Sequence, residues 1–116
     1  GYNGTGFDRL RIAKTYKYIE FINLTNVTAT TVWTPASGKK FRLMGVSISS
    51  GAAASLYLRD GAGGTQFHAY HSAGKDTHFF DFGNGYLSSA ANNVLEIYNG
   101  SGATVSVWVT AWGTEE

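Results

Sequence analysis

The chain has 116 residues, 43% of them hydrophobic and 15% charged, with a formal net charge of +1 and no cysteine. This size favours a single domain with its own core. The lack of cysteine excludes disulfide scaffolds, thiolate zinc sites and cysteine nucleophiles. The chain has no basic stripe and no apolar run of about 18 residues, so we expect neither a nucleic-acid partner nor a membrane partner.

The first 15 residues differ in character from the rest. Residues 1–6 are rich in Gly and Asn, and terminal segments of this kind are flexible unless something ties them down. The hydrophobic residues that follow predict an arm that contacts a partner through Phe7, Leu10 and Ile12. We therefore divide the chain into a flexible N-terminal arm, residues 1–15, and a β-sandwich domain, residues 16–116.

Eight segments with alternating side-chain character follow, separated by turns rich in Gly, Asn, Ser and Asp. Strands are predicted near residues 16–22, 27–34, 40–49, 54–59, 65–71, 78–82, 94–98 and 104–112. Residues 83–85 are predicted as a turn after the sixth strand, and residues 88–93 as a short helical turn at most. This pattern indicates an all-β, jelly-roll-like antiparallel β-sandwich of about eight strands, with a simpler Greek-key sandwich as the second choice.

Alternation also assigns each side chain of a strand to one face of its sheet. In the last strand Val105, Val107, Val109 and Ala111 are expected to face the core. The other inward pairs are predicted to be Leu56 with Leu58, Phe67 with Ala69, Phe80 with Phe82, and Leu95 with Ile97. The outward positions then carry many aromatic rings, namely Tyr57, His68, Tyr70, Phe79, Tyr98, Trp108 and Trp112.

Exposed rings in such numbers need a cover, because monomers seldom leave large apolar patches in water. One interpretation is that the loops or the arm cover them, or that they are spread singly over two sheets. The other is a subunit interface, in which Tyr and Trp are enriched. We favour the interface, in a homotrimer built through one outer sheet face, with candidate residues Tyr57, Tyr70, Tyr98, Trp108 and Trp112.

No catalytic, metal or cofactor site is predicted. His68, His71 and His78 lie close together in the sequence, but residues 68 and 71 are three apart on a strand, so unless a bulge intervenes they should point to opposite faces and cannot easily share an ion. Ser72, His78 and Asp81 could be combined into a hydrolase triad, but no Gly-x-Ser-x-Gly motif supports one. Asp60 precedes Gly61 at a predicted hairpin, where a bond from its side chain to the turn backbone would account for it.

Five segments resemble small virion proteins of tailed bacteriophages: VWTPASGKKFRL (32–43), SIS (47–49), LRDG (58–61), FDFGNGYL (80–87) and NNVLEI (92–97). The resemblance extends from about residue 32 to residue 112 and rests on turn and core positions. Head decoration proteins and tail-associated jelly-roll modules are the relevant types, whether from phages or from prophages. The resemblance implies no catalytic motif.

Two functions follow as expectations. In the first, the chain is a non-enzymatic structural protein at the surface of the phage particle that binds capsid or tail subunits, including the major capsid or tail protein. In the second, it is a receptor- or carbohydrate-binding module of a tail tip or fibre, because exposed indoles stack on sugar rings. Trp33, Trp108 and Trp112 are the candidates for that contact.

Overall fold

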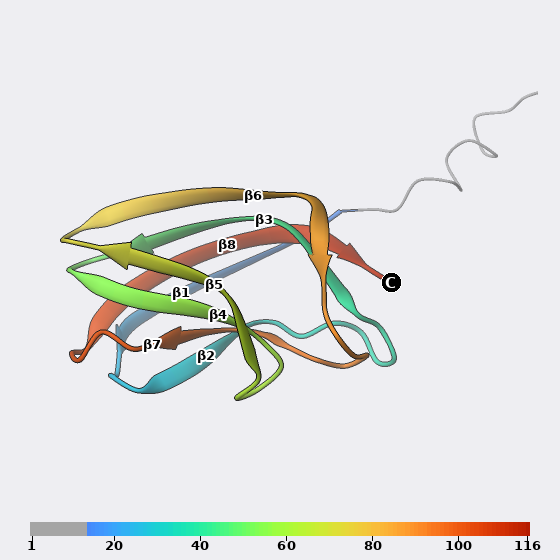
Figure 1. The fold of residues 1–116 in the computed structure, drawn as a ribbon, viewed down its shortest axis with the longest axis horizontal. Helices are drawn as coiled ribbons and strands as arrows, with labels where there is room; N and C mark the ends of the chain where they lie inside the picture. The colour runs from blue at the N-terminus through green and yellow to red at the C-terminus, as the bar shows by residue number, and fades with distance from the viewer. Residues whose placement is uncertain (1–13) are drawn as a thin grey trace, which may run out of the picture.

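The computed structural model describes residues 14–116, and at Ile22 the backbone alone. The predicted arm contacts Phe7, Leu10 and Ile12 lie outside these residues. Eight strands make up the domain (Figure 1). Their bounds are β1 Thr15–Leu24, β2 Thr28–Trp33, β3 Phe41–Ser50, β4 Ala54–Asp60, β5 Thr65–Ser72, β6 Asp76–Leu87, β7 Leu95–Asn99 and β8 Val105–Glu115.

The strands form two four-stranded antiparallel sheets, with the orders β1-β8-β3-β6 and β2-β7-β4-β5. The two sheets lie one above the other in Figure 1. β4 and β5 form a hairpin within one sheet, and every other connection passes from one sheet to the other. The chain is therefore one long hairpin, with β1 beside β8, β2 beside β7 and β3 beside β6, wrapped into two layers. This strand order is that of a jelly roll, which confirms the predicted fold class.

The core lies between the two layers and is built from the inward positions of both sheets. Val105, Val107, Val109 and Ala111 are buried there, as alternation predicts for β8. The predicted inward pairs of β4 and β7 are also fully buried. The largest fully buried side chains are Trp33, Phe41, Leu24, Leu43, Ile48, Leu56, Leu58, Leu95 and Ile97. Trp33 is therefore a core residue, and the expectation that it contacts a sugar is wrong.

The prediction for β5 is confirmed for Phe67, which packs against the core, but is wrong for the residues after it because the strand contains a bulge. Leu58 pairs with His68 and Arg59 with Gln66, so Phe67 is the extra residue between them. An extra residue reverses the faces of the residues that follow. Tyr70 and His68 therefore face inward, with Tyr70 only 4% exposed, while Ala69 is exposed.

The sixth strand is longer than predicted. Residues 83–85 do not end it, because β6 continues through them to Leu87. Gly83 and Gly85 have φ values of 65° and 97°, a conformation that glycine adopts without strain and that lets an extended strand bend. Residues 88–93 form bends and turns, with no helix. Among the described residues, no helix is long and apolar enough to cross a membrane.

A buried carboxylate links the β4–β5 hairpin to the loop after β6. Asp60 is 4% exposed and accepts hydrogen bonds from the Tyr86 hydroxyl at 2.7 Å, the Ser89 amide at 2.8 Å and the Asn93 side-chain amide at 2.9 Å. Burial raises the pKa of Asp60, but these bonds outweigh burial and hold the pKa below its ordinary value. Asp60 therefore ties two loops together, and the predicted bond from its side chain to the backbone of its own hairpin turn is wrong, because its carboxylate bonds to these three groups instead.

Candidate interaction surface

The register of the β1-β8-β3-β6 sheet arranges its outward side chains in three rows. Tyr16 pairs with Trp112, which pairs with Gly45, which in turn pairs with Asp81. The next row is Tyr18, Thr110, Ser47 and Phe79. The third row is Glu20, Trp108, Ser49 and Thr77. Each row crosses all four strands, so residues far apart in the sequence share one surface.

Trp112 is the centre of an aromatic cluster on this surface. The centre of its indole lies 6.4 Å from the Tyr16 ring, in a stacked arrangement, and 5.3 Å from the Phe79 ring. Tyr16, Tyr18 and Phe79 are 65%, 61% and 69% exposed. At about 200 Å² per aromatic side chain, roughly 400 Å² of ring surface is open to solvent. We call Tyr16, Tyr18, Phe79 and Trp112 the aromatic face.

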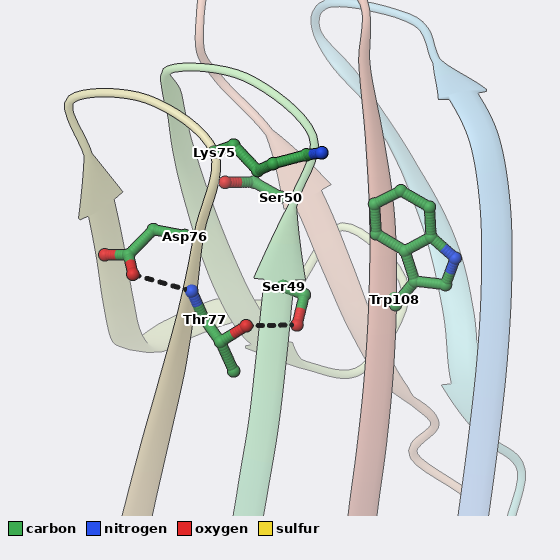
Figure 2. A pocket seen from close by; sticks show the side chains of 6 residues that line it. All are labelled: Ser49, Ser50, Lys75, Asp76, Thr77 and Trp108. Atoms are coloured by element: carbon green, nitrogen blue, oxygen red, sulfur yellow. Dashed lines mark hydrogen bonds between the residues drawn. The ribbon is translucent and has the colours of Figure 1, made fainter.

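An open hollow of about 440 Å³ lies on the same side of the molecule, at the end of the sheet where β3 ends and β6 begins (Figure 2). It is lined by Ser49, Ser50, Lys75, Asp76, Thr77 and Trp108. Two of its hydroxyls, Ser49 Oγ and Thr77 Oγ1, lie 2.9 Å apart, and the Thr77 amide donates to Asp76 Oδ1 at 2.8 Å. The hollow thus combines one indole with hydroxyl, carboxylate and ammonium groups.

The opposite outer face, on the β2-β7-β4-β5 sheet, has a different character. Tyr57 and Tyr98 are cross-strand partners with ring centres 6.3 Å apart. The Arg59 guanidinium lies 3.8 Å above the centre of the Tyr98 ring and 3.6 Å from Glu96 Oε1. These rings are half-buried, and they are partly covered by each other and by the charged side chains beside them.

The five predicted interface residues therefore occupy three places. Trp108 and Trp112 lie on the outer face of one sheet, Tyr57 and Tyr98 lie on the outer face of the other, and Tyr70 lies in the core. The prediction that Tyr70 is exposed is wrong because of the bulge at Phe67. Sequence reasoning did not include Tyr16 and Tyr18 in the interface, although their alternation with Glu20 in the first strand is a signal for one outward face.

The residues considered for a hydrolase triad make their hydrogen bonds elsewhere. Ser72 Oγ bonds to Ser50 Oγ at 3.1 Å, and Asp81 accepts from the Gly83 amide at 2.8 Å. His78 Nε2 lies 3.1 Å from Nε2 of His68. The bulge that turns His68 inward makes this contact. His71 lies on the outer face, where its Nδ1 is 3.0 Å from Ser55 Oγ.

No protein-family model and no curated protein sequence matches the chain. The structure is similar to the cyanophage Pam1 capsid asymmetric unit, with 18% identity and a TM-score of 0.49 over 89% of this chain and 84% of that one. It is also similar to Bacillus endospore appendages, which form disulfide-linked pili, with 12% identity and a TM-score of 0.45. That match covers 89% of this chain and 88% of the other. A virus-like particle of the Macrobrachium rosenbergii extra small virus gives 15% identity and a TM-score of 0.37. That match covers 90% of this chain and 80% of the other. Similarities at this level assign no function.

Proposed function

We propose that this chain is a non-enzymatic virion structural protein that binds other copies of itself, as a homotrimer, through the aromatic face. In this role it decorates the surface of a phage particle and also contacts the major capsid or tail protein. The observation that carries the proposal is the group of exposed rings on one sheet, at Tyr16, Tyr18 and Phe79. The jelly-roll topology and the resemblance of residues 32–112 to small phage virion proteins support it.

The aromatic face supplies about half of the roughly 800 Å² that each partner buries in a standard subunit interface. Burial of roughly 400 Å² of apolar surface stabilises by about 10 kcal/mol per copy at 25 cal/mol per Å². Association costs about 4–15 kcal/mol in lost translational and rotational freedom. Burial of the rings between the copies of the trimer therefore offsets a substantial part of that cost. An isolated monomer would forgo the same free energy.

The partner we favour for the aromatic face is a second copy of the same chain, because the centre of the face carries no charge. Thr110 and Ser47 lie between Tyr18 and Phe79, and Gly45 lies beneath the indole of Trp112. The acidic side chains Glu20 and Asp81 lie at its margins, on the two edge strands. A neutral aromatic surface needs no partner of opposite charge, so each copy can contact the next one around a threefold axis.

The oligomeric mass in solution tests this proposal. We expect sedimentation equilibrium or light scattering to give a trimer for the full chain, and a monomer for the Tyr18→Ser, Phe79→Ser double variant. Tyr57→Ser, on the opposite outer face, is the matched control and should keep the trimer. A wild-type monomer at tens of micromolar, or dissociation by Tyr57→Ser and not by the double variant, would overturn the proposal.

The hollow beside Trp108 favours one second function, carbohydrate recognition. It lies over Ser49, with Trp108 on the strand to one side and Thr77 on the strand to the other. Strands are about 4.8 Å apart, so Trp108 and Thr77 are separated by about 10 Å, the space that one sugar ring with its contacts needs. The indole would stack on the ring, while Asp76 and Lys75 would bond to its hydroxyls.

Tryptophan fluorescence titrated with host polysaccharide tests this function. A response should disappear in Trp108→Ala and persist in Trp112→Phe. No response in the wild type would exclude this function.

A further inference from the structure

His68 and His78 meet at the open side of the sandwich. His68 is on β5, the edge strand of one sheet, and His78 is on β6, the edge strand of the other. Both face inward, since they pair with the buried core residues Leu58 and Ile48. β5 and β6 are not hydrogen-bonded to each other as strands. The two imidazoles therefore link the two layers directly.

The two rings approach each other through the same nitrogen. Nε2 of His68 lies 3.1 Å from Nε2 of His78, and the rings are inclined by only 20°. Without a third atom, this contact is one N–H···N hydrogen bond, in which one ring carries its proton on Nε2 and the other on Nδ1. When both rings carry the proton on Nδ1, both Nε2 lone pairs are free to bind one ion. That arrangement is the donor set of a two-histidine metal site.

The spacing of the two nitrogens matches two positions of a metal coordination sphere. Zinc–imidazole bonds are about 2.0–2.1 Å long, so two nitrogens at the tetrahedral angle lie about 3.3 Å apart. At a right angle, as in the square-planar geometry of Cu²⁺ and Ni²⁺, the same bonds place them about 2.9 Å apart. The observed 3.1 Å falls between these values, so a dication could join the rings with shifts of a few tenths of an ångström.

The surroundings define the kind of ion. The two rings are half-buried among aromatic side chains, with the centre of Phe80 4.5 Å from His68 and the centre of Tyr70 5.1 Å from His78. Imidazole nitrogens with no carboxylate suit Zn²⁺, Cu²⁺ and Ni²⁺ and not Mg²⁺ or Ca²⁺. Among the described residues no group of three or more ligand side chains occurs, so the remaining coordination positions would be open.

The pair is accessible from outside. Both His68 and His78 are only half-buried, so each ring is partly open to solvent at the edge of the sandwich. Phe80, which packs on His68, is itself 38% exposed. An ion could therefore reach Nε2 without unfolding of either sheet.

We propose that His68 and His78 form a transition-metal site that joins the edge strands of the two sheets. The ion binds both Nε2 atoms, and the shared proton moves through solvent to Nδ1, so both rings remain neutral and no redox step occurs. A bound ion ties β5 to β6 across a boundary where no backbone hydrogen bonds cross. Metal binding is thereby linked to the stability of the whole sandwich.

Metal titration of the full chain, free of any histidine tag, tests the site. At pH 7.5 we expect millimolar Zn²⁺ or Ni²⁺ to raise the thermal midpoint by several degrees, while Mg²⁺ leaves it unchanged. The rise should be lost in His68→Asn and in His78→Asn. His71→Asn, on the outer face of the same strand, is the matched control and should keep the rise.

A second readout remains informative if a variant does not fold. In the wild-type chain at pH 7.5, substoichiometric Cu²⁺ should broaden the imidazole NMR signals of His68 and His78 before those of His71. Equal broadening of all three histidines, or a rise in midpoint that survives in His68→Asn, would overturn the proposal. No response to any of the three ions would show that the pair is a hydrogen bond only.

Discussion

The indole of Trp112 lies directly across the backbone of Gly45 on the neighbouring strand. A Cβ atom at position 45 would overlap with the six-membered ring of that indole, so no other residue fits there without a shift. Gly45 thereby lets Trp112 lie flat enough to contact both Tyr16 and Phe79. The aromatic face depends on this one missing side chain.

Gly45→Ala should therefore displace the indole of Trp112. We expect a loss of about 1–3 kcal/mol in the free energy of unfolding, the usual cost of an inserted methyl group in a packed site. Urea unfolding followed by tryptophan fluorescence measures this loss, and the emission maximum should also move. Gly74→Ala is the control, because a Cβ at position 74 meets nothing within 4 Å. Equal stability of the two variants would contradict the role given to Gly45.

Asp60→Asn should destabilise the domain, because the amide that replaces one carboxylate oxygen cannot accept a hydrogen bond. A bond to a charged group contributes about 1.5–3 kcal/mol, and Asp60 accepts three bonds. We expect chemical denaturation at pH 7 to show that the free energy of unfolding falls by at least the contribution of one such bond. Asp81→Asn, at an exposed carboxylate that accepts from the Gly83 amide of its own strand, should change stability by less than about 1 kcal/mol.

The same carboxylate predicts how stability responds to acid. The pKa of Asp60 is lowered in the fold, so its contribution is complete above the ordinary value of 3.8 and is lost as pH falls through the lower folded value. The wild-type chain should therefore lose stability below about pH 4 more steeply than Asp60→Asn. Unfolding midpoints in urea between pH 2 and pH 7 measure both slopes. Parallel slopes would show that Asp60 is not responsible.

From the lowered pKa of His68 we expect a second loss of stability, at a pH closer to neutral. Burial, and then the proximity of His78, lower the pKa of His68 below its ordinary value of 6.5. The unfolded chain therefore takes up a proton near pH 6.5 while the folded chain does not, so stability is complete above that pH and falls below it. In metal-free buffer, His68→Asn should show a smaller loss between pH 7 and pH 5 than the wild type. A loss of the same size in both would contradict the prediction.

Tyr70→Ala should lower the free energy of unfolding much more than Tyr57→Ala. Tyr70 is a core residue whose hydroxyl lies 3.4 Å from Ser50 Oγ, whereas Tyr57 is half-buried on an outer face. Loss of a large aromatic side chain from a core costs about 3–5 kcal/mol. We expect that cost for Tyr70→Ala and about half of it or less for Tyr57→Ala, measured by urea unfolding. The reverse order would place Tyr70 on the surface.

Local pattern was sufficient to predict the strands and most of their faces. The alternation of Val105, Val107, Val109 and Ala111 identified the inner side of β8, and the same rule worked for β4 and β7. It worked because a side-chain period of two is a property of the extended backbone itself. Glycines with positive φ lie in the turns after β2, β4 and β7, at Gly38, Gly61, Gly63 and Gly102, and these turns are local for the same kind of reason.

Tertiary structure decided everything that depends on which strands become neighbours. The bulge at Phe67 reversed the faces of His68 and Tyr70, and the φ values of Gly83 and Gly85 carried β6 through a predicted turn. The grouping of Tyr16 with Trp112 and Phe79, and the meeting of His68 with His78, join residues on different strands. Such contacts follow from register and sheet order, which are chosen by the packing of the whole core and not by any one segment.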